Sequence, residues 1–207
     1  MGKIKTISDW LYSSWPYALP FLAVYSLMFI FLFVYPLTLP VFLIWLCIPV
    51  YFIHEFEEYV YPGGFDEYTN QILQRHSGLD DDQCVLTPRA AYWINVGIIW
   101  FLFPLSAVLS TIYAPGFGVW VAWLTVVNGV LHIFQALQSR GYNPGLAASI
   151  FLNVPVGIAA VIVLAGVVPL WIVIISLLIA VILMAVIIVH CMARIRHLEK
   201  IGNKGRP

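Results

Sequence analysis

Residues 40–58 read PVFLIWLCIPVYFIHEFEE, an apolar run that ends in a cluster of ionisable side chains. An apolar run of about 20 residues is typical of a helix that crosses a lipid bilayer. Ionisable groups inside a membrane are costly, so they usually mark a functional site. Because a helix turns once in about 3.6 residues, His54, Glu57 and Glu58 project from one face, and Glu55 points about 100° away. We therefore expect a membrane helix that carries half of a functional site.

The whole chain shares this apolar character. Hydrophobic residues make up 62% of its 207 residues and charged residues 10%, whereas soluble domains contain about 25% charged residues. Apolar stretches long enough to span a bilayer lie near residues 16–35, 40–61, 90–112, 117–138, 146–166 and 169–192. A count of five spans stays open, since only Val167 and Val168 separate the last two. The sequence predicts an all-α, polytopic membrane bundle of about six helices, forming one domain over residues 1–207.

The basic residues predict how this bundle lies in the membrane. They are Lys3, Lys5, Arg75, Arg89, Arg140, Arg194, Arg196, Lys200, Lys204 and Arg206, and all fall in the termini or in alternate connections. The other three connections carry no charge. Because Lys and Arg are retained on the cytoplasmic side, we expect both termini in the cytoplasm and a plasma or bacterial inner membrane location. We expect membrane lipids as partners and no nucleic acid, because no basic stripe is present.

The only long connection covers residues 62–89. Phe65, Tyr68, Ile72 and Leu73 fall at helical spacing within it, which predicts a short amphipathic helix at the cytoplasmic interface. Thr87 followed by Pro88 is typical of the N-cap and first turn of a helix, here the third span.

A second half of the site is expected on the fourth span. His54 precedes Pro62 by eight residues, and His132 precedes Arg140 by eight. Both spans run towards the cytoplasm, so the two imidazoles should lie at a similar depth. Asn128 lies one helical turn before His132 on the same face. Further polar residues expected near this depth or at the entrance to the site are Asn95, Gln135, Arg140, Tyr142 and Asn153.

These residues carry a family resemblance. His54-x-x-Glu57-Glu58, followed by His132 and Tyr142-Asn143-Pro144-Gly145, resembles the HXXEE-domain family of integral membrane proteins, which has a further histidine and a Y-x-P-G motif. The resemblance covers residues 54–145 and implies the fold class and the site residues without implying a reaction. A looser similarity exists to CAAX-type intramembrane endopeptidases, from which this chain departs because His54 precedes the Glu pair by three residues.

The residues favour metal chemistry. Two imidazoles with one or two carboxylates suit a divalent metal, most readily zinc, with an open position for water. The ligands would come from His54, Glu57, Glu58 and His132, and a glutamate that does not bind the metal would act as general base. Asn128 would orient His132 or donate to a developing oxyanion. This hypothesis is hydrolysis of an amide or ester in a membrane-embedded lipid or peptide.

Three alternatives stay open. Paired acids beside a histidine can move protons across an isoprenoid or sterol double bond, which would make the protein a metal-free isomerase or cyclase. Intramembrane Glu and His side chains can also form a proton or cation path in a transporter. Finally, the polar groups can form a hydrogen-bond network that only fixes helix packing. The oligomeric state stays open.

Overall fold

Every regular element that the structure describes is helical. The structure is a computed structural model that describes residues 6–35, 37–80 and 82–204, and no strand occurs among these residues. Six helices are long and apolar enough to cross a membrane. The predicted all-α bundle and its count of six spans are therefore confirmed, and the chain is described below as a membrane protein.

The spans follow one another with short connections, except between the second and third. The first contains α1 (Ile7–Ser14), η1 (Trp15–Ala18), α2 (Leu19–Phe29) and η2 (Ile30–Val34), and the second is α3 (Leu39–Tyr59). The third contains α5 (Pro88–Ile94), η3 (Asn95–Leu102) and α6 (Phe103–Ile112). The fourth contains η4 (Pro115–Gly118) and α7 (Val119–Ser139), the fifth contains α8 (Leu146–Ala148), η5 (Ser149–Asn153) and α9 (Val154–Ala165), and the sixth is α10 (Leu170–Lys204).

The helix ends differ from the predicted ends in two places. The first span begins at Ile7 rather than near residue 16, because Thr6 accepts a hydrogen bond from the Asp9 backbone N–H and caps the helix. The last helix continues beyond residue 192 as far as Lys204. Its added segment, residues 193–204, contains Ala, Leu, Glu, Lys and Arg, which are good helix formers, and no proline interrupts it.

The long connection holds the predicted interfacial helix. It is α4 (Phe65–Ser77), which begins after Gly64 and ends before Gly78, two glycines with positive φ. The third span begins as expected, since the Thr87 hydroxyl accepts a hydrogen bond from the Ala90 N–H and Pro88 occupies the first turn.

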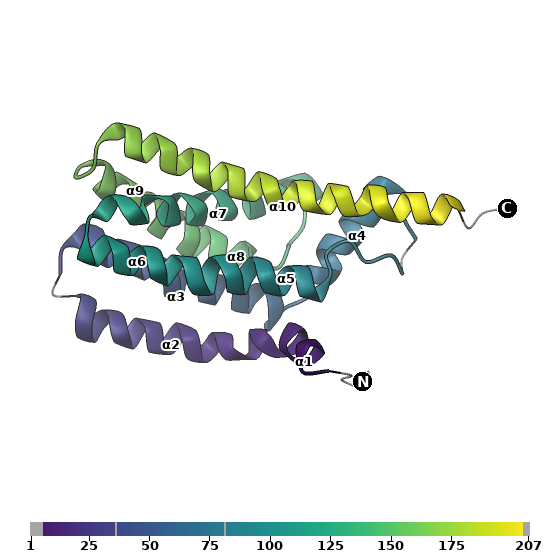
Figure 1. Cartoon of the computed structure of the whole chain (residues 1–207), viewed down its shortest axis with the longest axis horizontal. Coiled ribbons are helices and arrows are strands. Elements are labelled where there is room, and N and C mark those ends of the chain that lie inside the picture. Colours follow the sequence, from purple (N-terminus) through teal and green to yellow (C-terminus); the bar gives the residue numbers. More distant parts are fainter. Residues whose placement is uncertain (1–5, 36, 81, 205–207) are drawn as a thin grey trace.

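The second and fourth spans form the centre of the bundle. In an 18-residue apolar stretch of each of these two spans, 56% of the residues are buried, against 17% in the sixth span. Helix α7 packs against α3, α9 and α10. In Figure 1, α10 lies along one edge of the bundle and α2 along the opposite edge, with α3, α6 and α7 between them. This arrangement buries the polar ends of α3 and α7 among the other helices.

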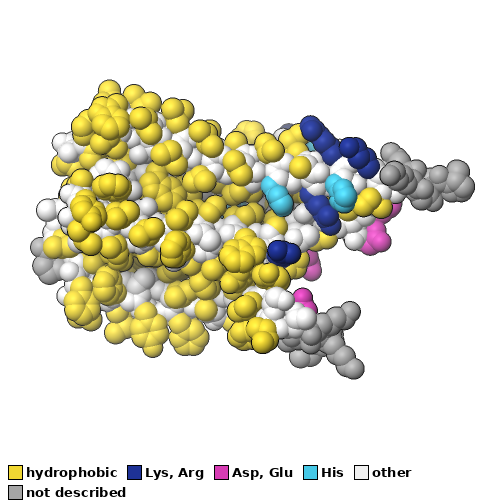
Figure 2. All heavy atoms as spheres, in the orientation of Figure 1, with side chains coloured by type: hydrophobic (Ala, Val, Ile, Leu, Met, Phe, Trp, Pro, Cys, Tyr) yellow, Lys and Arg dark blue, Asp and Glu magenta, His cyan; other side chains and the backbone are white. Residues whose placement is uncertain are grey.

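The charged side chains gather at one end of the bundle. Helix α1 and the C-terminal end of α10 lie at this same end (Figure 1). Figure 2 shows that the visible Lys, Arg, Asp, Glu and His side chains lie there, while hydrophobic side chains cover the rest of this face. Lys3, Lys5, Arg206 and the side chain of Lys204 lie outside the described residues. The cytoplasmic location of this end stays a prediction.

Candidate metal centre

Three side chains from α3 and α7 meet at one buried point. His54 and Glu58 lie one turn apart on α3, and His132 lies on α7. The Glu58 Oε1 atom lies 3.5 Å from His54 Nε2 and 3.2 Å from His132 Nε2. The three ligand atoms lie within 4.8 Å of one another, and all three residues are buried. The expected meeting of the second and fourth spans at these side chains is therefore confirmed.

Hydrogen bonds reach both imidazoles, at Nδ1 of His132 and at Nε2 of His54, whereas His54 Nδ1 has no partner among the described residues. The Asn128 side-chain N–H donates to His54 Nε2 at 2.8 Å. His132 Nδ1 donates to Asn143 Oδ1 at 2.8 Å, and the Asn143 amide in turn donates to the His132 carbonyl at 2.9 Å. With Nδ1 protonated, His132 Nε2 and Glu58 Oε1 present lone pairs towards one another, whereas the lone pair of His54 Nε2 is engaged by the Asn128 amide. Such an arrangement needs a proton or a metal ion between them.

The turn after α7 closes the site. Gly145 has a φ of +95°, and a Cβ atom built on it would lie 2.7 Å from His54 Cε1 and 2.8 Å from His132 Cε1. Only glycine fits here, because it tolerates positive φ and leaves room for both rings. The Y-x-P-G motif is therefore a part of the site, through Asn143 and Gly145, and more than a turn between two spans.

Glu57 lies outside the three-residue cluster. Its Oε1 accepts hydrogen bonds from the Tyr142 hydroxyl at 2.7 Å and the Ala147 N–H at 2.9 Å. Its Oε2 accepts from the Ala148 N–H at 2.6 Å. The carboxylate therefore sits at the N-terminus of the fifth span, where unpaired N–H groups and the helix dipole favour an anion. Glu57 joins α3 to the turn that carries Asn143 and Gly145.

Tyr142 serves this contact as a donor. Burial raises the pKa of its phenol above the usual value, and the hydrogen bond to Glu57 and the charge of that carboxylate raise the pKa further. The hydroxyl therefore stays protonated at neutral pH and donates a hydrogen bond to Glu57.

Glu55 points away from the cluster, as expected from the helical period. It is fully buried, and its Oε2 accepts a hydrogen bond from Trp100 Nε1 at 2.8 Å. Its Oε1 has no partner among the described residues. Glu55 therefore connects the second span to the third rather than to the fourth.

The remaining expected residues are distributed around the cluster. Asn128 bonds His54 rather than His132. Asn95 donates to the Tyr59 hydroxyl at 3.1 Å and to the Ala91 carbonyl at 2.9 Å. Arg140 is exposed and ends α7 in a left-handed conformation, and Asn153 is fully buried with neither side-chain atom partnered among the described residues.

Two residues of the site were missed by sequence reasoning. Asn143 and Gly145 lie in a Tyr-Asn-Pro-Gly run, and each of these residues is a strong turn former. Turn chemistry alone accounts for the run, so its contacts with His54 and His132 left no separate signal. The motif resemblance was the one available indication that the run belongs with the histidines.

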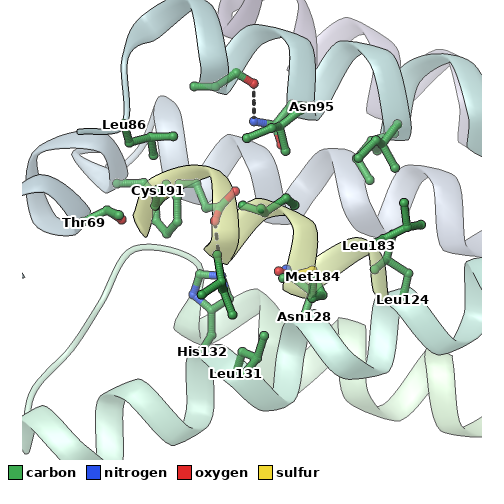
Figure 3. A pocket seen from close by; sticks show the side chains of 18 of the residues that line it. Thr69, Leu86, Asn95, Leu124, Asn128, Leu131, His132, Leu183, Met184 and Cys191 are labelled. Carbon is green, nitrogen blue, oxygen red and sulfur yellow. Dashed lines mark hydrogen bonds and ion pairs between the residues drawn. The ribbon is translucent and has the colours of Figure 1, made fainter. Parts of the chain in front are cut away.

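A pocket of about 270 Å³ opens beside the cluster. Glu58, His132 and Asn128 form part of its wall, together with Asn95 and Gln135. Figure 3 shows Asn128 and His132 of α7 and Asn95 of the third span facing the same space as Leu183, Met184 and Cys191 of α10. The dashed lines in that view mark the contacts of His132 with Glu58 and of Asn95 with Tyr59. The cluster is therefore adjacent to a space that can hold a ligand.

The comparison with known protein families agrees with the motifs. Residues 45–160 match the family model described as "Protein of unknown function with HXXEE motif". This segment is more than half of the chain, and it contains the cluster and the turn through Gly145. No curated protein and no solved structure matches the chain significantly.

Proposed function

We propose a function for this chain, which belongs to the HXXEE family of proteins of unknown function, from the chemistry of its buried His54–Glu58–His132 cluster. The chain is a divalent-metal-dependent hydrolase that cleaves an ester or amide bond in a membrane-embedded substrate. The observation that supports this proposal is the convergence of two imidazole nitrogens and one carboxylate oxygen at a buried point beside a pocket.

The spacing of the three atoms suits a small divalent ion. Ligands at about 2.0–2.1 Å from a tetrahedral zinc ion lie about 3.3 Å from each other. The two distances from Glu58 Oε1 to the imidazoles are 3.5 and 3.2 Å. Three protein ligands of the His and Glu type leave a fourth position for water, as in catalytic zinc sites. We assign His54 Nε2, His132 Nε2 and Glu58 Oε1 as the ligands; a metal ion at His54 Nε2 would replace the hydrogen bond from the Asn128 amide.

The residues around the ligands divide the remaining tasks. A divalent ion supplies a Lewis acid and an activated water. Glu58 uses Oε1 for both imidazoles, so its second oxygen can accept a proton from the attacking water. Asn128 borders the pocket and carries an N–H group that can donate to the substrate carbonyl. Asn143 holds the His132 ring in the required tautomer, the usual role of a group behind a metal-binding histidine.

Metal analysis of the purified full chain tests the proposal. Wild type, Glu58→Gln, His132→Ala and the control Glu55→Gln are loaded with zinc, desalted and measured by elemental mass spectrometry. Glu55→Gln is a matched control because Glu55 is a buried glutamate of the same helix that bonds Trp100 outside the cluster. We expect one zinc ion in wild type and in Glu55→Gln, and at least ~10-fold weaker zinc binding in the two ligand variants.

A wild-type chain that binds no metal would indicate a different function. The same contacts, at 3.2 and 3.5 Å, are also compatible with proton transfer between Glu58 and the imidazoles. If the folded wild type binds none of zinc, manganese, iron or cobalt stoichiometrically, the hydrolase proposal fails. A metal-free lipid isomerase, with Glu58 and His132 moving the proton, is then the candidate to test with unsaturated lipids.

A further inference from the structure

We propose that the pocket beside the cluster binds the hydrocarbon chain of an uncharged, single-chain lipid, with its ester or amide carbonyl at Glu58 and His132. The reaction at the carbonyl rests on the proposed function, while the binding of the chain rests on the pocket alone. The proposal narrows the substrate to a neutral lipid and excludes a peptide.

The wall of the pocket is suited to a hydrocarbon chain. Most of its lining residues are apolar, and the lining comes mainly from α3, α4, the third span, α7 and α10. Met184 and Met192 of α10 belong to this wall. Methionine side chains are flexible and polarisable, so they adapt to an irregular or mobile apolar ligand. A peptide would instead bring one N–H and one C=O group per residue, and the few polar wall groups could not satisfy them.

The charge of the wall favours an uncharged ligand. Glu58 is the one carboxylate among the described lining residues, and no Lys or Arg lines the pocket. The other polar groups, such as Thr69, Asn95 and Gln135, are neutral. They can bond the hydroxyl groups or the carbonyl of a neutral headgroup, whereas a phosphate or a free carboxylate would meet the Glu58 carboxylate and no Lys or Arg among the described lining residues.

The size of the pocket favours one chain. Sites for small organic ligands usually have a volume of about 300–1,000 Å³. At about 270 Å³ this pocket lies just below that range. It therefore suits one chain near the reactive group rather than a two-chain phospholipid.

The position of α10 indicates how the chain enters. This helix packs mainly on α7 and α9, and it is the least buried of the six spans. Its residues Leu183, Ile187 and Cys191 line the pocket opposite Ile94 and Ile98 of the third span. A lipid chain can therefore enter from the bilayer between the third and sixth spans.

Cys191 provides a direct measurement on the wild-type chain. Cys191 lines the pocket, whereas Cys84 lies outside it on the neighbouring loop. The full chain is placed in two-chain phospholipid nanodiscs with a metal chelator and treated with N-ethylmaleimide, and the modification of each cysteine is followed by peptide mass spectrometry. The probes are a long-chain monoglyceride and the fatty acid of the same chain length.

The monoglyceride should protect Cys191 and leave Cys84 unchanged. At a concentration of about ten times its Kd, the monoglyceride should slow the modification of Cys191 about 10-fold, because only about a tenth of the pockets are then free of lipid. The fatty acid should need at least ~10-fold higher concentration for the same protection, since with the metal chelated its carboxylate meets the Glu58 carboxylate and no Lys or Arg among the described lining residues. Equal protection by both probes, or protection of Cys84 as well, would overturn the proposal.

A variant pair gives a second measurement that does not depend on cysteine reactivity. Ile187→Trp fills the pocket from α10, and the matched control Ile182→Trp changes an exposed residue of the same helix that does not line the pocket. Binding of radiolabelled monoglyceride to the nanodiscs should fall at least ~10-fold in Ile187→Trp and stay unchanged in the control. Equal binding by the two variants would overturn the proposal.

The two proposals fail separately. The first case is that the chain binds monoglyceride in the presence of chelator, but neither binds zinc nor hydrolyses the lipid when no chelator is present. This result would support the pocket proposal and contradict the hydrolase proposal. Zinc-dependent hydrolysis that is equally fast in Ile187→Trp and in wild type would keep the hydrolase and remove the pocket proposal.

Discussion

Gly145 has the least freedom of any residue at the site. Its φ of +95° and its approach to both imidazoles leave no room for a side chain. We expect Gly145→Ala to displace His54 and His132 and to weaken zinc binding at least ~10-fold, as changes behind metal ligands usually do. Zinc affinity, measured by competition with a chelating dye, checks this prediction.

Gly64→Ala is the matched control for Gly145→Ala. Gly64 also has a positive φ, +88°, but nothing lies within 4 Å of its added Cβ atom. It should lose about 1–2 kcal/mol of stability from backbone strain, with unchanged zinc affinity. Zinc binding by Gly145→Ala that equals wild type would show that the turn does not position the histidines.

Glu57 differs from Glu58 in what its carboxylate contacts. Because Glu57 accepts three hydrogen bonds from the turn and from the start of the fifth span, its role is to hold the turn. The Glu57→Gln amide would place an N–H group against a backbone or hydroxyl donor. We expect the free energy of unfolding to fall by about 1–3 kcal/mol, measured by SDS titration in mild detergent.

Tyr142→Phe measures how much the Tyr142 hydroxyl contributes to the hydrogen bonding of Glu57. It removes one of the three donors to Glu57 and should cost about 1 kcal/mol, less than Glu57→Gln. If Glu57→Gln keeps its stability and its zinc but loses hydrolysis, Glu57 is a catalytic residue and the assignment to the turn is wrong.

At the scale of elements, the contact of α9 with α7 depends on small residues. A Cβ atom at Gly157 would lie 2.6 Å from Val126 Cγ2 and 3.2 Å from the Ala122 carbonyl oxygen. Backbone atoms cannot move aside as a side chain can, so Gly157→Ala should separate the helices and cost about 1–3 kcal/mol. The same SDS titration measures this change.

Gly97→Ala is the control for this helix contact. Gly97 also lies within a span, in η3, but nothing lies within 4 Å of its added Cβ atom. Alanine should therefore leave stability unchanged or raise it by about 0.5–1 kcal/mol. Equal effects at Gly97 and Gly157 would mean that the close approach of α9 to α7 does not contribute to stability.

At the scale of the molecule, the charge distribution predicts one orientation. The Lys and Arg side chains visible in Figure 2 lie at the end of the bundle where α10 finishes. We expect this end in the cytoplasm. In a variant with Cys47, Cys84 and Cys191 replaced by alanine, Tyr113→Cys and Ser139→Cys place reporters at opposite ends of the fourth span.

A membrane-impermeant maleimide distinguishes the two orientations. It should label the Tyr113→Cys variant in intact cells and the Ser139→Cys variant only after lysis. The reverse pattern would show that the basic end faces outward. Zinc content measured on the same two variants shows whether each retains the site.

Local patterns were sufficient for the spans and for one pair of site residues. Hydropathy and helix capping depend on neighbouring residues, so six spans and the start of the third at Thr87–Pro88 followed from the sequence. The shared depth of His54 and His132 followed from counting residues to the ends of two helices, because the rise per residue is constant. These features require no knowledge of which helices are neighbours.

The different roles of the two motif glutamates required the tertiary structure. Glu57 and Glu58 are adjacent and share a helix face, so helical periodicity could not separate them. Glu58 meets His132 of the fourth span, whereas Glu57 meets Tyr142, Ala147 and Ala148, which lie 85, 90 and 91 residues further along the chain. The pocket likewise exists only because α10 packs beside α7. Contacts of this kind depend on how the helices assemble, which a local pattern of residues does not specify.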